Sequence, residues 1–206
     1  MTNFEIRVCE SCGLRYPLTE GSSFGIRCPI CLGITHAVLN KQISSESALT
    51  DRKKKRDELT VLVDNVRSAW NVGSILRSAD GFGFSHAFLC GITPTPEVDA
   101  VRKTALGADD FVPWSYHKDA VKLVKGLKKE GWVIWALEEE ERAKPLKKIK
   151  RRIEQRTVLI AGSEVTGVDP ELLDLCDEVF YIPMRGEKRS FNVAVAFGIA
   201  GFTLSS

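Results

Sequence analysis

The sequence predicts an α/β domain built on a parallel β-sheet, preceded by a small domain that cysteines hold together. Two observations carry this prediction. From residue 59 onward, short apolar runs alternate with amphipathic stretches, a pattern typical of strands and helices that alternate along the chain. Before them, four of the six cysteines fall within the first 31 residues. We therefore expect a cysteine-rich domain over residues 1–40, a charged linker over residues 41–58 and the α/β domain over residues 59–206.

The composition narrows the classes of protein to which the chain can belong. It has 206 residues, of which 44% are hydrophobic and 27% charged, enough apolar residues for a packed core. No apolar run reaches the ~18–20 residues that cross a bilayer. The first residues lack the basic and apolar regions of a secretory signal. We therefore expect a cytoplasmic protein that makes no contact with a membrane.

The charged residues are distributed unevenly. A net charge of +2 does not indicate a general attraction for nucleic acid. Two basic runs, within residues 52–56 and 144–152, are nevertheless dense enough for local contacts with phosphate. Each run is equally typical of a solvated linker or helix face, so both interpretations stay open.

The four N-terminal cysteines form two Cys-x-x-Cys pairs, Cys9 with Cys12 and Cys28 with Cys31, with fifteen residues between the pairs. This spacing is typical of zinc bound by four thiolates in a tetrahedron. A segment of ~40 residues also has too little core to fold without such a site. His36 is an alternative ligand, and two redox dithiols or incidental buried thiols are the competing interpretation. Because four thiols lie in so short a segment, we expect a zinc ribbon bound through all four cysteines.

Six apolar runs in the α/β domain predict strands. Their near-continuous apolar character is typical of strands buried on both faces of a parallel sheet. Cys90 and Cys176 stand in apolar surroundings, so we expect both in the core. The strands are expected at residues 59–64, 86–90, 111–114, 132–137, 157–161 and 178–183.

Five further stretches predict helices between and after these strands. In the first, Val72, Ile75, Leu76 and Ala79 recur with the period of one helix face. In the fourth, Pro170 stands at an early position, where its missing N–H is not needed. The last is mostly apolar. The helices are expected at residues 71–82, 97–106, 118–130, 170–175 and 192–204.

Polar residues follow the first and fifth strands, where ligands bind in parallel α/β sheets. Asn71 would cap the first helix, and Arg77, six residues later, could grip a phosphate. After the fifth strand comes a Gly-containing loop with Glu164, in which Gly162 would let a ligand approach the backbone closely. The loop matches neither Gly-x-Gly-x-x-Gly nor a P-loop. Taken alone, a capping asparagine and a surface arginine are common.

The last strand leads into a polar loop that contains Ser190 and Asn192 and enters the final helix. Both side chains can hydrogen-bond a neighbouring loop or a ligand. A plain helix cap is the competing interpretation of Ser190.

Together these three segments resemble the motifs of the SpoU/TrmH family of RNA ribose 2′-O-methyltransferases, within the SPOUT superfamily. Asn71 and Arg77 match the family's Asn-x-x-x-x-x-Arg motif, and residues 162–167 match Gly-x-Glu-x-x-Gly. Residues 182–184 and 190–193 match Ile-Pro-Met and Ser-Leu-Asn-Val, with Phe191 in place of the leucine. The resemblance covers about residues 59–206.

The resemblance implies a fold and a cofactor that hydrophobic periodicity does not show. The C-terminal part would be tied in a deep trefoil knot, an exception to the rule against knots. The knot would hold S-adenosylmethionine, with the backbones near Gly162, Ile182 and Phe191 lining its site and Leu137 and Met184 as further contacts. The family's enzymes are homodimers, so we expect a homodimer with the final helix near the interface and the site shared between subunits.

The reaction that the resemblance implies is transfer of a methyl group from the sulfonium to a ribose 2′-hydroxyl of tRNA or rRNA. A guanidinium almost never deprotonates in a protein. Arg77 is therefore expected to bind the adjacent phosphate and stabilise the developing alkoxide rather than act as a base. Asn71 would orient the nucleotide, and Glu164, Ser190 and Asn192 would hold Arg77 and the knot loops in place.

Three alternatives compete with this interpretation: a non-catalytic RNA- or ribosome-binding protein on the same fold, a base methyltransferase, and a purely structural zinc protein. The polar residues of the three motifs argue against the first and third, and the SpoU-type motif set argues against the second. The ribbon and the basic run within residues 52–56 are expected to grip RNA backbone, although such ribbons also bind protein. The ribbon's candidate phosphate contacts are Arg7, Arg15 and Arg27.

Overall fold

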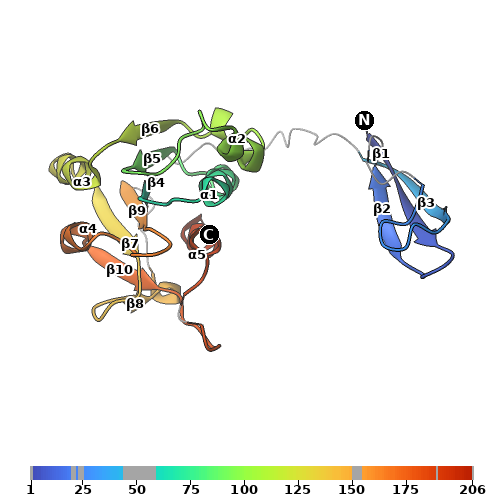
Figure 1. Ribbon diagram of the computed structural model, residues 1–206. Helices are drawn as coiled ribbons and strands as arrows, with labels where there is room; N and C mark the ends of the chain where they lie inside the picture. Colours follow the sequence, from blue (N-terminus) through green and yellow to red (C-terminus); the bar gives the residue numbers. More distant parts are fainter. Residues whose placement is uncertain are drawn as a thin grey trace. The chain divides into compact units, whose positions relative to one another are not determined.

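A computed structural model describes residues 2–19, 22, 26–43, 59–149, 155–188 and 190–205. The chain divides into two compact units, Met1–Arg52 and Lys53–Ser206 (Figure 1). The basic run within residues 52–56 lies outside the described residues, as do residues 150–152 of the second run.

The first unit is a three-stranded antiparallel sheet in the order β2-β1-β3. Its strands are β1 (Thr2–Cys9), β2 (Arg15–Thr19) and β3 (Thr35–Ile43). Among its described hydrophobic residues, three are buried: Cys9, Tyr16 and Cys28. Two of these are candidate metal ligands, so little remains that could serve as a hydrophobic core.

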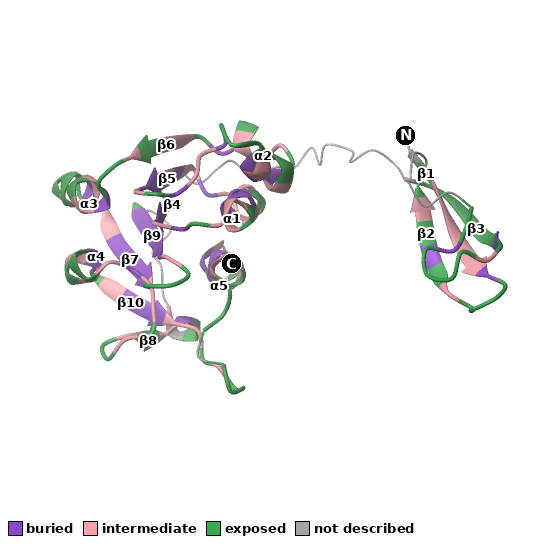
Figure 2. Cartoon of the chain, viewed as in Figure 1, coloured by how far each residue is buried: buried purple, intermediate pink, exposed green. Residues whose placement is uncertain are grey.

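The second unit contains a seven-stranded sheet in the order β6-β5-β4-β9-β7-β10-β8, with parallel pairing throughout. The predicted parallel α/β fold is confirmed. Every residue of the central strands β4 and β9 is buried, as expected of a parallel sheet covered on both faces (Figure 2). The strands are β4 (Leu59–Asp64), β5 (His86–Cys90), β6 (Trp114–His117), β7 (Val133–Leu137), β8 (Lys144–Pro145), β9 (Thr157–Ala161) and β10 (Glu178–Tyr181).

Helices cover the two faces of this sheet with separate hydrophobic clusters. On one face, α1, α2 and α5 pack around residues such as Ile75, Val101 and Phe197. On the other face, α3 and α4 contribute Val124 and Leu172 (Figure 1). No described helix is long and apolar enough to cross a bilayer. The helices are α1 (Ala69–Gly81), α2 (Asp99–Ala105), α3 (Ala120–Lys129), α4 (Pro170–Leu175) and α5 (Val193–Ser205), with short 3₁₀ turns η1 (Ala108–Asp110) and η2 (Leu146–Lys148).

The expected strand at residues 111–114 is wrong. The turn η1 ends just before this segment, residues 111–113 are not in a strand, and the edge strand β6 begins only at Trp114, which pairs with Ala87 of β5. Pro113 has no N–H to donate to a ladder, so it precedes the strand. Val112 is fully buried because it packs into the core. An apolar run therefore marked a core contact, not a strand.

Candidate functional site

Three neighbouring strands of the second unit end at the same edge of the sheet: β7 at Leu137, β9 at Ala161 and β10 at Tyr181. The segments that follow these strands line a cavity of about 350 Å³. Cavities of this size, at the carboxyl ends of parallel strands, are where α/β folds bind small ligands.

Sequence reasoning named five residues for a cofactor, and all five line this cavity. The wall also contains Glu164 and Ser190, which were expected to act in the reaction. Asn71, Arg77 and Asn192 are not among the lining residues. The five residues are Leu137, Gly162, Ile182, Met184 and Phe191.

The loop after β9 folds tightly onto itself. Ser163 and Gly167 exchange two backbone hydrogen bonds of 3.0 Å. A Cβ at Gly162 would collide with the backbone nitrogen of Val168. The sequence analysis expected a glycine here so that a ligand could approach the backbone. In the structure, glycine is required because the loop's own backbone lies too close for a Cβ. The loop thereby forms one wall of the cavity.

Glu164 joins this loop to the start of α1. Its carboxylate accepts hydrogen bonds from the backbone nitrogens of Arg67 (3.0 Å) and Ser68 (3.1 Å) and from the Asn71 amide (2.8 Å). An anion at a helix N-terminus is favoured by the unpaired N–H groups and the helix dipole. Burial raises the pKa of Glu164, but these hydrogen bonds outweigh it and hold the pKa below its usual value.

Asn71 was expected to cap the first helix, but it does not. α1 begins two residues earlier, with Ser68 as its N-cap. The Asn71 side chain instead links the other two motifs. Its Nδ2 donates to Glu164, and its Oδ1 accepts from Asn192 at 3.0 Å. Asn192 in turn caps α5 by accepting from the backbone nitrogen of Ala194 at 2.9 Å. The three motifs therefore meet in one chain of hydrogen bonds.

Arg77 takes no part in these hydrogen bonds. Six residues turn an α-helix by about 600°, so Arg77 and Asn71 lie about 120° apart around α1. Arg77 is exposed, and no described residue forms a hydrogen bond or ion pair with its guanidinium. The hydrogen bonds of Glu164 and Asn192 that the structure records go to Asn71 and to backbone nitrogens, not to Arg77. The expectation that Glu164, Ser190 and Asn192 hold Arg77 stays a prediction.

Sequence reasoning missed Glu138, the first residue after β7. Its side chain lines the cavity and accepts a hydrogen bond from the backbone nitrogen of Val168 at 2.9 Å. Its position directly after a strand at the cavity edge was the available signal, since carboxyl ends of parallel strands carry ligand sites.

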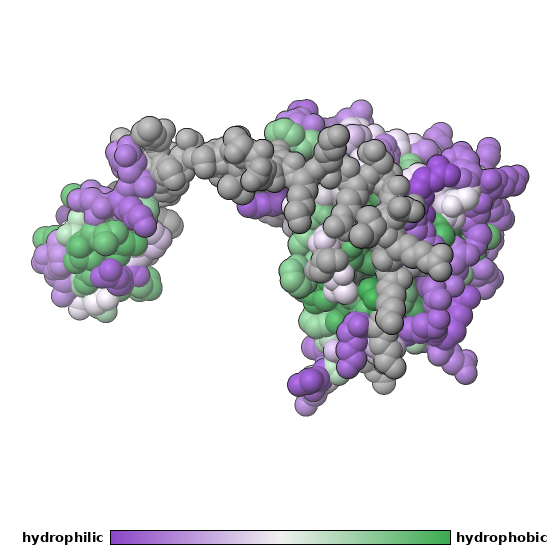
Figure 3. Space-filling model, turned by 180° about the vertical axis from the view of Figure 1, so that it is seen from behind, coloured by the Kyte–Doolittle hydropathy of each residue, from purple (hydrophilic) through white to green (hydrophobic). Residues whose placement is uncertain are grey.

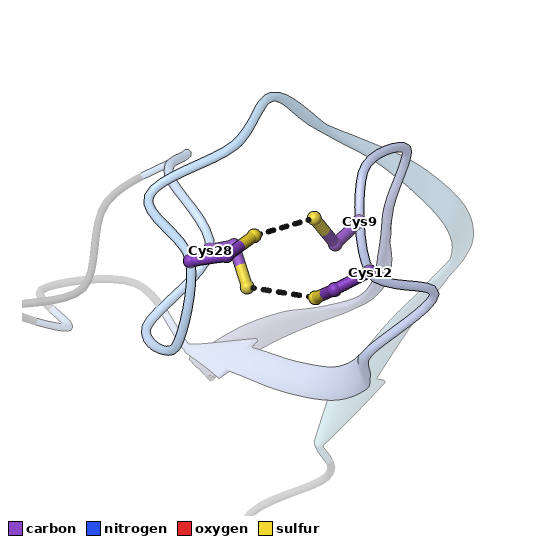
Figure 4. Close-up of side chains that lie close together, drawn as sticks. Cys9, Cys12 and Cys28 are labelled. Atoms are coloured by element: carbon purple, nitrogen blue, oxygen red, sulfur yellow. Dashed lines mark hydrogen bonds between the residues drawn. The ribbon is translucent and has the colours of Figure 1, made fainter.

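The four N-terminal cysteines form a second candidate site, in the first unit. Their sulfurs all lie within 4.8 Å of one another, with Cys9 3.4 Å from Cys31 and Cys12 3.6 Å from Cys28. A zinc ion with Zn–S bonds of 2.3 Å requires sulfurs about 3.8 Å apart in a tetrahedron. Figure 4 shows Cys9 and Cys12 facing Cys28 across the site. The donor set and its spacing therefore fit zinc.

Backbone amides prepare the first cysteine of each pair as a thiolate. The N–H of Cys12 lowers the pKa of Cys9 to about 6, and the N–H of Cys31 lowers the pKa of Cys28. The N–H of Gly33 lowers the pKa of Cys31 as well, but the sulfurs of its neighbours raise it to about 12. Thiols this close do not all ionise unless a cation lies between them.

Two other ribbon side chains are already engaged. His36, the alternative ligand, lies 3.5 Å from the carboxylate of Glu10 and outside the group of four cysteines. The Arg7 guanidinium contacts Glu5 at 2.5 Å and Thr35 at 2.7 and 2.9 Å. Arg7 was expected to contact phosphate, but these bonds already occupy its guanidinium. Arg15 and Arg27 are exposed.

Comparisons with known proteins agree with this geometry. The model of the SpoU rRNA Methylase family matches residues 58–202. Over 150 residues the chain is 31% identical to the tRNA (guanosine(18)-2′-O)-methyltransferase of Thermus thermophilus, which covers 73% of this chain and 75% of that enzyme. Over 162 residues it is 33% identical to the 23S rRNA (guanosine-2′-O-)-methyltransferase of Coxiella burnetii, which covers 75% of this chain and 61% of that enzyme.

A solved structure shares the fold of the second unit. The AdoMet-bound rRNA methyltransferase of Sinorhizobium meliloti superimposes with a TM-score of 0.66 and 26% identity, covering 73% of this chain and 59% of that one. This chain thus spans less than two thirds of the Sinorhizobium and Coxiella proteins. The family match covers well over half of the 206 residues, so the chain belongs to the SpoU rRNA methylase family.

Proposed function

We propose that this protein transfers a methyl group from S-adenosylmethionine to a ribose 2′-hydroxyl of tRNA or rRNA. The observation that carries the proposal is the cavity at the ends of β7, β9 and β10, whose wall contains every residue expected to hold the cofactor. The names of the Thermus and Coxiella relatives support the same reaction, since both are guanosine 2′-O-methyltransferases. We accordingly expect the protein to act in the cytoplasm, where such RNA substrates are found.

The cavity suits a cationic ligand. Glu139 and Glu164 contribute carboxylates to its wall, and none of the described lining residues is a lysine or arginine. When bound, S-adenosylmethionine supplies a methyl group on a positively charged sulfonium, which this field favours. Leu137, Ile182 and Phe191 would supply the apolar contacts that exclude water from it.

The proposal includes the trefoil knot. The strand order supports it, because β9 and β10 are consecutive in the chain but lie on opposite sides of β7. The segments that leave both strands line the same cavity, so each passes close to the other.

We propose that Arg77 acts in the site of a second copy of the chain. Arg77 is exposed, lies outside the cavity wall and is bonded to no described residue, so it is free to reach a partner. The side chains of Val195 and Phe202 on α5 are 50% and 66% exposed and would supply the apolar dimer contact. In that site the guanidinium would bind the phosphate next to the target ribose and stabilise the negative charge that develops on the 2′-oxygen.

Mixed dimers test the shared site. Arg77→Ala and Gly162→Val variants should each be inactive, the second because its new Cβ collides with Val168. If Arg77 serves its partner, a 1:1 mixture forms heterodimers with one intact site and recovers about a quarter of the wild-type activity. If Arg77 serves its own chain, the mixture stays inactive and the shared site is wrong.

The reaction itself is tested with labelled S-adenosylmethionine and RNA that lacks its natural modifications, digested to nucleosides. A labelled 2′-O-methylnucleoside is the expected product. A labelled base would make the protein a base methyltransferase. Absence of cofactor binding and of label would favour a non-catalytic RNA-binding protein.

We propose that the first unit binds zinc through its four cysteines and that it contributes to RNA binding, together with the basic run within residues 52–56. Arg15 and Arg27 are exposed and support contacts with phosphate. Deletion of residues 1–56 should weaken RNA binding and flatten its salt dependence. Unchanged affinity and slope would assign the unit to a protein partner or to stability instead.

A further inference from the structure

The loop after β9 is held by a carboxylate that follows the neighbouring strand β7. β9 lies between β4 and β7 in the sheet. Glu138, directly after β7, accepts a hydrogen bond from the backbone nitrogen of Val168 at 2.9 Å. The Val168 amide is therefore fixed to the carboxylate that follows β7.

The loop is shaped to receive Glu138. Gly167 adopts a φ of +72°, and a Cβ at this position would collide with the Glu138 carboxylate. The second carboxylate oxygen of Glu138 accepts from the backbone nitrogen of Glu139 at 3.0 Å, which fixes the orientation of the side chain. A hydrogen bond to a charged acceptor is stronger than one between neutral groups. This contact therefore has the strength to select one conformation of the loop.

The consequence reaches the cavity because the same loop forms its wall. Residues 162–167 all line the cavity, and Val168 follows them directly. On the other side of the loop, Glu164 bonds to the start of α1. Glu138 is thus the contact that sets where the wall stands relative to β7.

We propose that Glu138 is a positioning residue that holds residues 162–168 in the conformation that binds S-adenosylmethionine. The inference rests on the proposed function and adds to it a residue outside the family motifs on which that function was based. Glu138 acts through the loop and not through its charge on the cofactor.

Two variants separate these roles. Glu138→Ala removes both acceptors, whereas Glu138→Gln keeps one oxygen that can accept from Val168 but removes the charge. Glu141→Ala is the matched control, because Glu141 is exposed, lies outside the cavity wall and changes the charge by the same amount. The measurements are the dissociation constant of S-adenosylmethionine by calorimetry, amide hydrogen exchange at Val168 and the affinity for RNA.

We expect Glu138→Ala to weaken cofactor binding by at least about tenfold and to speed exchange at Val168, with RNA affinity unchanged. Glu138→Gln should stay within about threefold of the wild type, because the hydrogen bond to Val168 survives. If Glu138→Ala binds S-adenosylmethionine as tightly as Glu141→Ala does, only the positioning role is overturned. The same holds if Glu138→Gln binds the cofactor as weakly as Glu138→Ala, since the charge of Glu138 would then be the property that matters. A wild-type protein that does not bind S-adenosylmethionine would overturn the proposed function as well.

Discussion

The two units of the chain are stabilised by different means. In the first unit, the buried hydrophobic residues that the structure describes are Tyr16 and two cysteines. The second unit buries two continuous hydrophobic clusters, one on each face of its sheet (Figure 2). Apolar side chains are also visible on the surface of both units (Figure 3). By exposed fraction, Ile26, Ile30 and Leu32 of the first unit are each more than 60% exposed. The second unit is thus held by burial, and we expect the first to depend on a metal.

Removal of zinc should produce the largest effect. Chelation, or Cys28→Ser, should unfold the first unit and leave the second intact, because structural zinc contributes about 10 kcal/mol or more to such small domains. Amide exchange should become fast in residues 2–43 only, and metal analysis should find one zinc per chain, lost in the variant. Retained protection of residues 2–43 without metal would show that the first unit has a sufficient core of its own.

A cavity in the hydrophobic core should give the next largest effect, confined to the second unit. Phe197 is fully buried and its ring lies 5.0 Å from that of Phe84. Phe197→Ala should lower the free energy of unfolding by about 3–5 kcal/mol. Ile92→Ala, at a residue 65% exposed, is the control and should change it by less than about 0.5 kcal/mol. Equal effects in chemical denaturation would contradict the assignment of the core.

The same difference between units explains what the sequence could predict. The strands of the second unit were found because burial on both faces makes each of them an apolar run, as in residues 157–161 of β9. Two strands are exceptions. β6 has half-buried and exposed residues at the edge of the sheet, so the apolar signal came from the neighbouring core residue Val112 instead. β8 was not predicted, because its two residues, Lys144 and Pro145, fall in the second basic run. In the first unit the cysteine spacing predicts a metal site, and the four sulfurs lie close enough together to fit one. The strands of this unit were not predicted, although Phe4, Ile6 and Val8 alternate with polar residues along β1.

The sequence predicted those site residues that belong to motifs in the loops after the strands. Gly162 and Phe191 were named from motifs and line the cavity. The role of Asn71 was not predictable, because its partners Glu164 and Asn192 lie 93 and 121 residues away in the sequence. Glu138 was also missed. Its role depends on a hydrogen bond from the Val168 amide, which lies 30 residues away in the sequence.

Acid should weaken the second unit through Glu164. The pKa of this carboxyl is lower in the folded chain than in the unfolded one, so its ionised form stabilises the fold. That contribution is complete above the ordinary carboxyl pKa and is lost as the pH falls through the lowered value. Glu164→Gln should therefore be less stable than the wild type at pH 7, with the difference shrinking as the pH falls through the lowered pKa.

Thermal unfolding of both proteins across this pH range tests the assignment. Glu141→Gln is the control, because this side chain is exposed and forms no hydrogen bond that the structure records. A difference between wild type and Glu164→Gln that grows toward acid would contradict the sign of the shift.

The smallest effect should come from the backbone conformation of the residue that follows each Cys-x-x-Cys pair, which differs in cost between the two pairs. The residue after the first pair is Gly13, with a φ of +71°, and the residue after the second pair is Leu32, with a φ of +60°. Glycine adopts this left-handed conformation freely, whereas other residues lose about 1–2 kcal/mol. Leu32 is also 69% exposed, so its side chain recovers little of this by packing. Leu32→Gly should raise the stability of the zinc-bound unit by about 0.5–1 kcal/mol, after the greater freedom of glycine in the unfolded chain is subtracted.

The control for this substitution is Ile30→Gly, two residues earlier in the same loop. Ile30 is 73% exposed, like Leu32, but it is not among the residues with positive φ, so the glycine brings only its loss of backbone entropy and should destabilise. Thermal unfolding of the zinc-loaded chain, followed by amide exchange in residues 26–43, separates the two outcomes. Destabilisation by both variants would mean that the Leu32 side chain packs against the unit more than its exposure indicates, and the first unit would then rely on apolar contacts as well as on its metal.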